Sequence, residues 1–110
     1  MLSPVIKAEI DAIRADNVNG ATPLAMRAAK CLGRLADELD PGSDSWPALL
    51  EAAAALVAAQ PVMAPIINLV NVVLLETEEG ESRVPFPERL ARAAERFQQQ
   101  RREFETSITR

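Results

Sequence analysis

The chain has 110 residues, a net charge of −4, no His, one Cys and 4% aromatic residues. That length admits one domain with a core of its own, and a composition rich in Ala and Leu favours an all-helical core. A single Cys excludes an internal disulfide, the lack of His removes the commonest general base and metal ligand, and the acidic balance argues against nucleic acid as a partner.

The N-terminal residues predict a first helix. Ser3 is a good N-cap and Pro4 is favoured at the first helical position. The helix should end near Asp16, because residues 17–20 include Asn and Gly, which tolerate turn conformations. Its apolar positions recur at i, i+4 and i+7, on one helical face: Ile6, Ile10 and Ile13.

A second helix is predicted to begin at Thr22, as the N-cap, and Pro23, and to end before residues 40–42. Gly33 weakens the middle of this helix and is explained most simply by a close helix crossing. Cys31 is predicted to be a buried, unreactive thiol on the apolar side. The apolar positions of this helix are Ala25, Ala28, Leu32, Leu35 and Leu39.

Ser45 is predicted to cap a third helix, which ends at Gln60 because the residue before Pro61 is disfavoured in helical conformation. The Ala run at residues 52–55 should allow a neighbouring backbone to approach closely. The buried face of this helix is predicted to consist of Leu49, Leu50, Ala53, Leu56 and Val57.

The fourth helix, predicted at about 65–79, is the most apolar. From Ile66 to Leu75 only Asn68 and Asn71 are polar, and a helix apolar on nearly every face must be surrounded by protein. We therefore predict a bundle of about five helices around this buried central helix. Asn68 and Asn71 should be buried polar residues that hydrogen-bond each other or loop backbone, with ligand binding as the alternative.

The end of the fourth helix carries acidic residues where the helix dipole disfavours them: Glu76, Glu78 and Glu79. They would be stabilised if Arg side chains of the last segment reached them. Gly80 is predicted to be a left-handed C-cap. The apolar run is shorter than the roughly 20 residues that span a bilayer, and no signal peptide is recognised. We therefore expect no membrane association and a cytoplasmic location.

A long fifth helix should start at Pro87 and run to the C-terminus, with its last turns contacting something outside the bundle. Its Arg residues alternate with Glu and lack aromatic stacking partners, which is a weak nucleic-acid signal. An interaction helix is the better interpretation. Its contact residues are predicted to be Leu90, Phe97, Phe104 and Ile108.

Motifs for chemistry are missing from the sequence. It has no phosphate-binding glycine loop, no zinc-ligand spacing and no nucleophile elbow. Its carboxylate pairs, such as Glu76 with Glu79, are predicted to be solvated, whereas an acid–base pair needs one member in an apolar environment. We therefore predict no catalytic residue, no metal site and no cofactor.

Three segments carry a family resemblance: DNVNGATPLAMRAAKCL, AAQPVMAPIINLVN and AAERFQQQRREF. In that order and spacing they resemble the N-terminal helical domain of the translation initiation factor 2B-like superfamily, which includes ribose 1,5-bisphosphate and methylthioribose 1-phosphate isomerases. The resemblance implies that residues 1–110 are one helical domain followed, in a longer protein, by a Rossmann-like domain. The alternative is a free-standing helical protein.

The resemblance also implies a ligand-pocket edge at Asn19, Gly20, Ala21, Gln60 and Pro61. The isomerases usually have Arg at the positions of Asn19 and Gln60; an amide can hydrogen-bond a phosphate but supplies no charge. The catalytic Cys of the family lies in the absent domain and is not Cys31.

Three functions are consistent with the sequence. The first is a non-catalytic domain that supports protein–protein interaction and covers the neighbouring domain's ligand site. The second is part of an aldose–ketose isomerase acting on a phosphorylated sugar. The third is a stand-alone dimerisation module. The expected partner is protein, either the chain's own C-terminal domain or a second copy, with a phosphorylated small molecule as a ligand of the parent protein.

Overall fold

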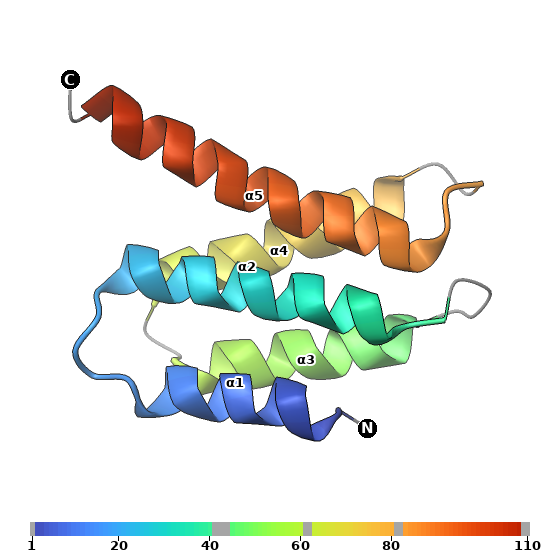
Figure 1. The fold of residues 1–110 in the computed structure, drawn as a ribbon, viewed down its shortest axis with the longest axis horizontal. Coiled ribbons are helices and arrows are strands. Elements are labelled where there is room, and N and C mark those ends of the chain that lie inside the picture. The colour runs from blue at the N-terminus through green and yellow to red at the C-terminus, as the bar shows by residue number, and fades with distance from the viewer. Residues whose placement is uncertain (1, 41–44, 61–62, 81–82, 109–110) are drawn as a thin grey trace.

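The described part of the chain forms five helices (Figure 1). The structure, a computed structural model, describes the backbone of residues 2–40, 45–60, 63–80 and 83–108 and the side chains of these residues up to 100. No strand occurs among them, so the predicted all-α bundle with a long last helix is confirmed. The helices are α1 (Pro4–Ala15), α2 (Ala21–Glu38), α3 (Trp46–Ala59), α4 (Ala64–Glu79) and α5 (Phe86–Ile108).

Ser3 and Ser45 both occupy the predicted N-cap positions, although the Ser45 side chain makes no capping hydrogen bond. The Ser3 hydroxyl accepts a hydrogen bond from the backbone N–H of Ile6 at 3.2 Å, as expected of an N-cap. The prediction for the start of α2 was wrong, because Gly20 and not Thr22 is the N-cap. Extended backbone at Gly20 lets its carbonyl accept from the N–H of Leu24 at 3.3 Å, so the helix begins at Ala21.

The central position in the bundle belongs to α2, which packs against each of the other four helices. Small side chains make this possible, because alanines let neighbouring helices approach closely. The prediction that the helix at 65–79 is central and buried on nearly every face was therefore wrong. Eight of the 18 residues of α2 are less than a tenth exposed: Leu24, Ala25, Ala28, Ala29, Cys31, Leu32, Leu35 and Ala36.

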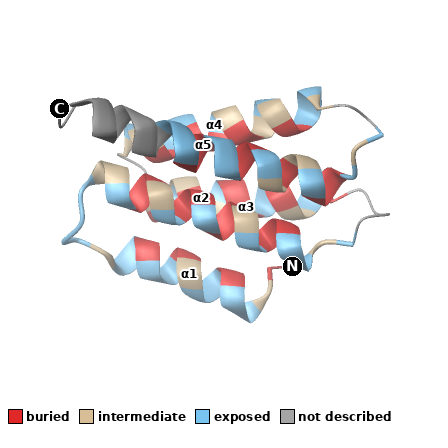
Figure 2. Cartoon of the chain, turned by 45° about the horizontal axis from the view of Figure 1, so that its top comes forward, coloured by how far each residue is buried: buried red, intermediate tan, exposed pale blue. Residues whose placement is uncertain are grey.

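One core runs through all five helices, and in Figure 2 the buried segments of each helix face the interior of the bundle. Trp46 and Phe86 are the first residues of α3 and α5, and their rings pack edge to face with centroids 5.2 Å apart. Among the described residues, no helix is both long and apolar enough to cross a membrane. The largest fully buried side chains include Ile6, Ile13, Leu24, Leu32, Leu49, Leu56, Ile66, Leu69, Leu90 and Val73.

Gly33 lies where α2 faces α5, but the packing does not require a glycine there. A Cβ built on Gly33 would lie 4.0 Å from the Cβ of Ala94, which is ordinary van der Waals contact. Because glycine inside a helix costs roughly 0.5–1 kcal/mol relative to alanine, we expect Gly33→Ala to raise the free energy of unfolding by about that amount. Urea denaturation checks this; a loss of stability would mean that α2 and α5 lie closer than described.

Candidate functional site

Two of the predicted pocket residues, Asn19 and Gln60, each hydrogen-bond Asp16, in the turn that follows α1. There the side-chain amide of Gln60 donates hydrogen bonds to the carbonyl oxygens of Ile13 at 2.9 Å and Asp16 at 3.2 Å, with a longer one to Arg14 at 3.5 Å. The last carbonyls of a helix have no partner within it. Gln60 therefore caps the C-terminus of α1, while Pro61 lies outside the described residues.

Asp16 organises the rest of this turn. Its Oδ1 accepts from the backbone N–H groups of Val18 and Asn19, both at 2.9 Å, and its Oδ2 accepts from the Asn19 side-chain amide at 2.7 Å. Arg27 of α2 reaches Oδ2 at 3.0 Å. The predicted site residue Asn19 is thus tied to the turn, and its neighbours Gly20 and Ala21 form the start of α2.

The hydrogen bonds around Asp16 act on its charge. The backbone N–H and side-chain amide of Asn19, followed by the Val18 N–H and Arg27, favour the ionised carboxylate and lower the pKa of Asp16 to about 2. Sequence spacing alone did not single out this aspartate. A carboxylate followed by a short turn that contains Asn is a known signal for side-chain bonding to the turn backbone.

This pKa predicts a pH dependence of stability. Because the folded-state pKa lies below the ordinary value of 3.8, the stabilisation by ionised Asp16 is present above pH 4 and is lost as the pH falls toward 2. Asp16→Asn should therefore be less stable than the natural chain at pH 7, and most of the difference should be lost by pH 2. Urea denaturation at both pH values tests it, with Asp11→Asn as a control; an unchanged difference at pH 2 would contradict the prediction.

Asn68 and Asn71, predicted to be buried, are both exposed. They lie on the side of α4 that points away from the core, whereas Ile66, Leu69, Val70 and Val73 point into it. Their amides therefore need no protein partner. Leu50 of α3, also predicted to be buried, is 51% exposed.

The predicted interaction residues of α5 divide into two groups. Leu90 and Phe97 are buried, at 0% and 5% exposure, because the face of α5 that carries them packs on α2 and α4. Their assignment to an interaction surface was wrong. The side chains of Phe104 and Ile108 lie outside the described residues, although the backbone of α5 continues to Ile108.

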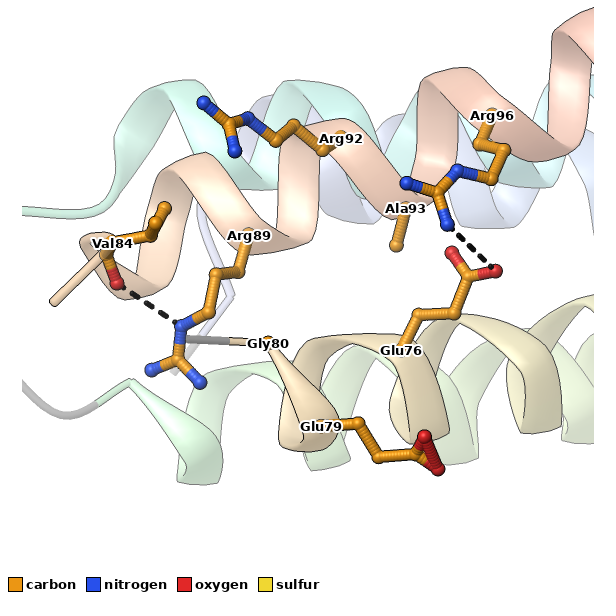
Figure 3. Close-up of a pocket in the computed structure, with 8 residues that line it drawn as sticks. All are labelled: Glu76, Glu79, Gly80, Val84, Arg89, Arg92, Ala93 and Arg96. Carbon is orange, nitrogen blue, oxygen red and sulfur yellow. Dashed lines mark hydrogen bonds and ion pairs between the residues drawn. The ribbon is translucent and has the colours of Figure 1, made fainter. Parts of the chain in front are cut away.

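A cleft of about 380 Å³ lies between the end of α4 and the first half of α5 (Figure 3). At its end the guanidinium of Arg89 donates to the carbonyl oxygens of Thr77 at 2.8 Å and Val84 at 3.2 Å. Arg89 therefore caps α4, whose last carbonyls lack partners in the helix. The cleft is lined by Glu76, Glu79, Gly80, Val84, Arg89, Arg92, Ala93 and Arg96.

Arginines of α5 do reach the acidic end of α4. Arg96 pairs with Glu76 at 3.5 Å, and Arg92 pairs with Glu88 one turn earlier in its own helix at 2.9 Å. The Arg96–Glu76 pair and the Arg89 cap place positive charge at the negative end of the α4 dipole, which helps to offset the carboxylates there. Since its arginines have partners inside the chain, the cleft is of mixed charge and is a poor site for a small anion.

Gly80 was predicted to be a left-handed cap, but its backbone is extended, with φ −62° and ψ 155°. Any residue adopts that conformation. Glycine is favoured there for another reason, because a Cβ would lie 2.5 Å from Cδ and 3.0 Å from Cγ of Arg89. The capping arginine passes directly over this glycine and makes a Schellman-type ending unnecessary.

Cys31 of α2 lies in the core of the bundle and is fully buried. Burial raises the pKa of its thiol to about 12, and the neighbouring carboxylate of Glu9 acts in the same direction. A thiol in this environment is a poor nucleophile. In the described part of the chain, no group of three or more His, Cys, Asp or Glu residues is placed to hold a metal ion.

The outward side of α4 exposes apolar and amide side chains together. Leu75 is 55% exposed and Ile67 is 37% exposed. Asn71 lies between them at four-residue steps, so the three share one stripe of the helix. We call this surface the α4 outer face, and it consists of Ile67, Asn68, Asn71, Leu75 and Glu78.

Comparison of the chain with protein-family models, with curated proteins and with solved structures gives no significant match. The resemblance to the initiation factor 2B-like superfamily therefore stays a prediction. The α4 outer face is the surface that sequence reasoning missed. The sequence did contain a sign of this surface. Asn68 and Asn71 are three residues apart, so they place polar side chains on one side of an otherwise apolar helix.

Proposed function

We propose that this chain is a non-catalytic helical domain that binds another protein through the α4 outer face. The observation that carries the proposal is the exposure of Leu75 and Ile67 on one stripe of a helix whose other side is anchored in the core. Exposed apolar side chains grouped on one surface, without charge between them, are typical of protein-binding sites. The asparagine amides at the same surface can supply hydrogen bonds.

The remaining polar groups support an interaction role over a chemical one. The Gln60 amide caps α1, Asp16 holds the turn after it, and Arg89 caps α4. Each is committed to a backbone partner whose loss would cost stability. Two of the residues predicted at a ligand pocket, Asn19 and Gln60, therefore already have hydrogen-bond partners within the fold.

The proposal includes the broader expectation from the resemblance. The chain would then be the helical domain of an initiation factor 2B-like protein, and its protein partner would include the Rossmann-like domain whose ligand site it covers. The sugar-phosphate isomerase alternative gains no support from Gln60, because its side-chain amide already donates hydrogen bonds to backbone carbonyls at the end of α1. The dimerisation alternative is weakened because Leu90 and Phe97 lie in the core.

Photo-crosslinking in cells that naturally express the chain tests the proposal. A photoreactive amino acid is placed at Asn71 of the full chain, with Val5, a 47% exposed residue of α1, as the matched position. We expect protein adducts of defined mass from position 71 that disappear when Leu75→Asp is added. The absence of adducts at position 71, or the same adducts from position 5, would refute the proposal.

A further inference from the structure

Charge is distributed unevenly over the bundle. No lysine or arginine lies between Arg34 and Arg83 in the sequence. The charged side chains of α3 and α4 are therefore all carboxylates. On α4 these gather at the C-terminal end, where Glu78 and Glu79 are exposed beside Leu75. The helix dipole adds negative potential at that same end. The α4 outer face therefore combines an apolar stripe with a negative end.

We propose that the occupant of the α4 outer face is an amphipathic helix of a partner protein whose charged side chains are basic. This inference rests on the proposed function and specifies its partner. An amphipathic helix presents apolar side chains at i, i+3, i+4 and i+7, which matches a stripe formed by Ile67, Asn71 and Leu75. Basic side chains flanking that stripe would face Glu78 and Glu79, and complementary charge sets the orientation of docking.

A second copy of the chain fits this surface less well. The described lysines and arginines lie on α1, α2, α5 and the turn before α5. Most arginines there already have carboxylate partners within the chain. A second copy would have to replace these pairs with equivalent ones across the interface, so they would add almost no net attraction. The pairs are Arg14–Asp11, Arg27–Asp16, Arg34–Glu9, Arg92–Glu88 and Arg96–Glu76.

The test uses three synthetic helical peptides with the same leucine stripe and with Lys, Gln or Glu at every polar position. Fluorescence anisotropy measures their affinity for the full chain in low and moderate salt. We expect the Lys peptide to bind about tenfold or more tightly than the Gln peptide, the Glu peptide not to bind, and the preference for Lys to shrink with salt. Leu75→Asp should weaken Lys-peptide binding by about tenfold or more.

General attraction to an acidic protein is excluded by a matched pair of variants. Glu78→Lys and Asp37→Lys make the same charge change at exposed positions near the ends of α4 and α2. Glu78→Lys should weaken Lys-peptide binding about fivefold or more, and Asp37→Lys by less than about twofold. Equal effects of the two variants would overturn the inference.

The other outcomes separate this inference from the proposed function. Equal binding of the Lys and Gln peptides, lost in Leu75→Asp, would keep a docking surface and reject a basic partner. A homodimer detected by sedimentation and lost in Leu75→Asp would make a second copy the occupant and overturn the inference. Selective Lys-peptide binding without adducts at position 71 in cells would support the chemistry of the face and reject its use as a protein-binding site.

Discussion

Leu90→Ala is expected to destabilise the chain by about 2–5 kcal/mol, the usual cost of deleting a buried leucine side chain. Leu90 is fully buried where α5 packs on α2 and α4. The substitution removes apolar area from the core and leaves a cavity that alanine-rich α2 cannot fill by repacking its own short side chains. Urea denaturation followed by circular dichroism measures the loss, which we expect without a change in the fold of the remaining protein.

The matched control for this prediction is Leu75→Ala. Leu75 has the same side chain and also lies on a helix, but it is 55% exposed. Its replacement should change the free energy of unfolding by less than about 0.5 kcal/mol. A large loss of stability from Leu75→Ala would mean that the α4 outer face is covered within the chain. A small loss from Leu90→Ala would mean that Leu90 does not pack in the core.

The contrast between these leucines shows what sequence could and could not predict. Helix starts were predictable at Ser3 and Ser45, and apolar periodicity located α1 and α5, because caps and stripes depend on nearby residues. The central helix was not predictable from hydrophobicity. α2 buries four alanines and packs against all four other helices, whereas the bulkier α4 keeps one side in solvent.

The site was harder to predict for a related reason. Gln60 and Ile13 are 47 residues apart, yet the amide of one caps the carbonyl of the other. Arg89 and Thr77 are similarly brought together only by the packing of α5 on α4. Side-chain caps between different helices depend on tertiary packing, which spacing in a single sequence does not encode. A polar residue beside a Pro or Gly could therefore resemble a ligand site and still serve the fold.

Arg89→Ala should destabilise the chain by about 2–3 kcal/mol, since hydrogen bonds from charged groups to protein acceptors are each worth roughly 1.5–3 kcal/mol in favourable cases. The substitution leaves the Thr77 carbonyl at the end of α4 without its partner. It also removes the guanidinium that lies 5.5 Å from the centre of the Phe86 ring. Urea denaturation measures the loss, and Arg92→Ala, whose side chain is 61% exposed, is the matched control with little expected effect.

Gly80 provides the independent test that Arg89 acts as a cap. An alanine at position 80 would place Cβ against Cδ and Cγ of Arg89 and push the guanidinium away from its carbonyls. Gly80→Ala should therefore cost about 1–2 kcal/mol in the natural chain and less than about 0.5 kcal/mol once Arg89 is alanine. Additive effects of the two substitutions would show that Gly80 and Arg89 stabilise α4 separately. Non-additive effects would establish that one side chain, crossing over one glycine, fixes the acidic end of the helix that presents the α4 outer face.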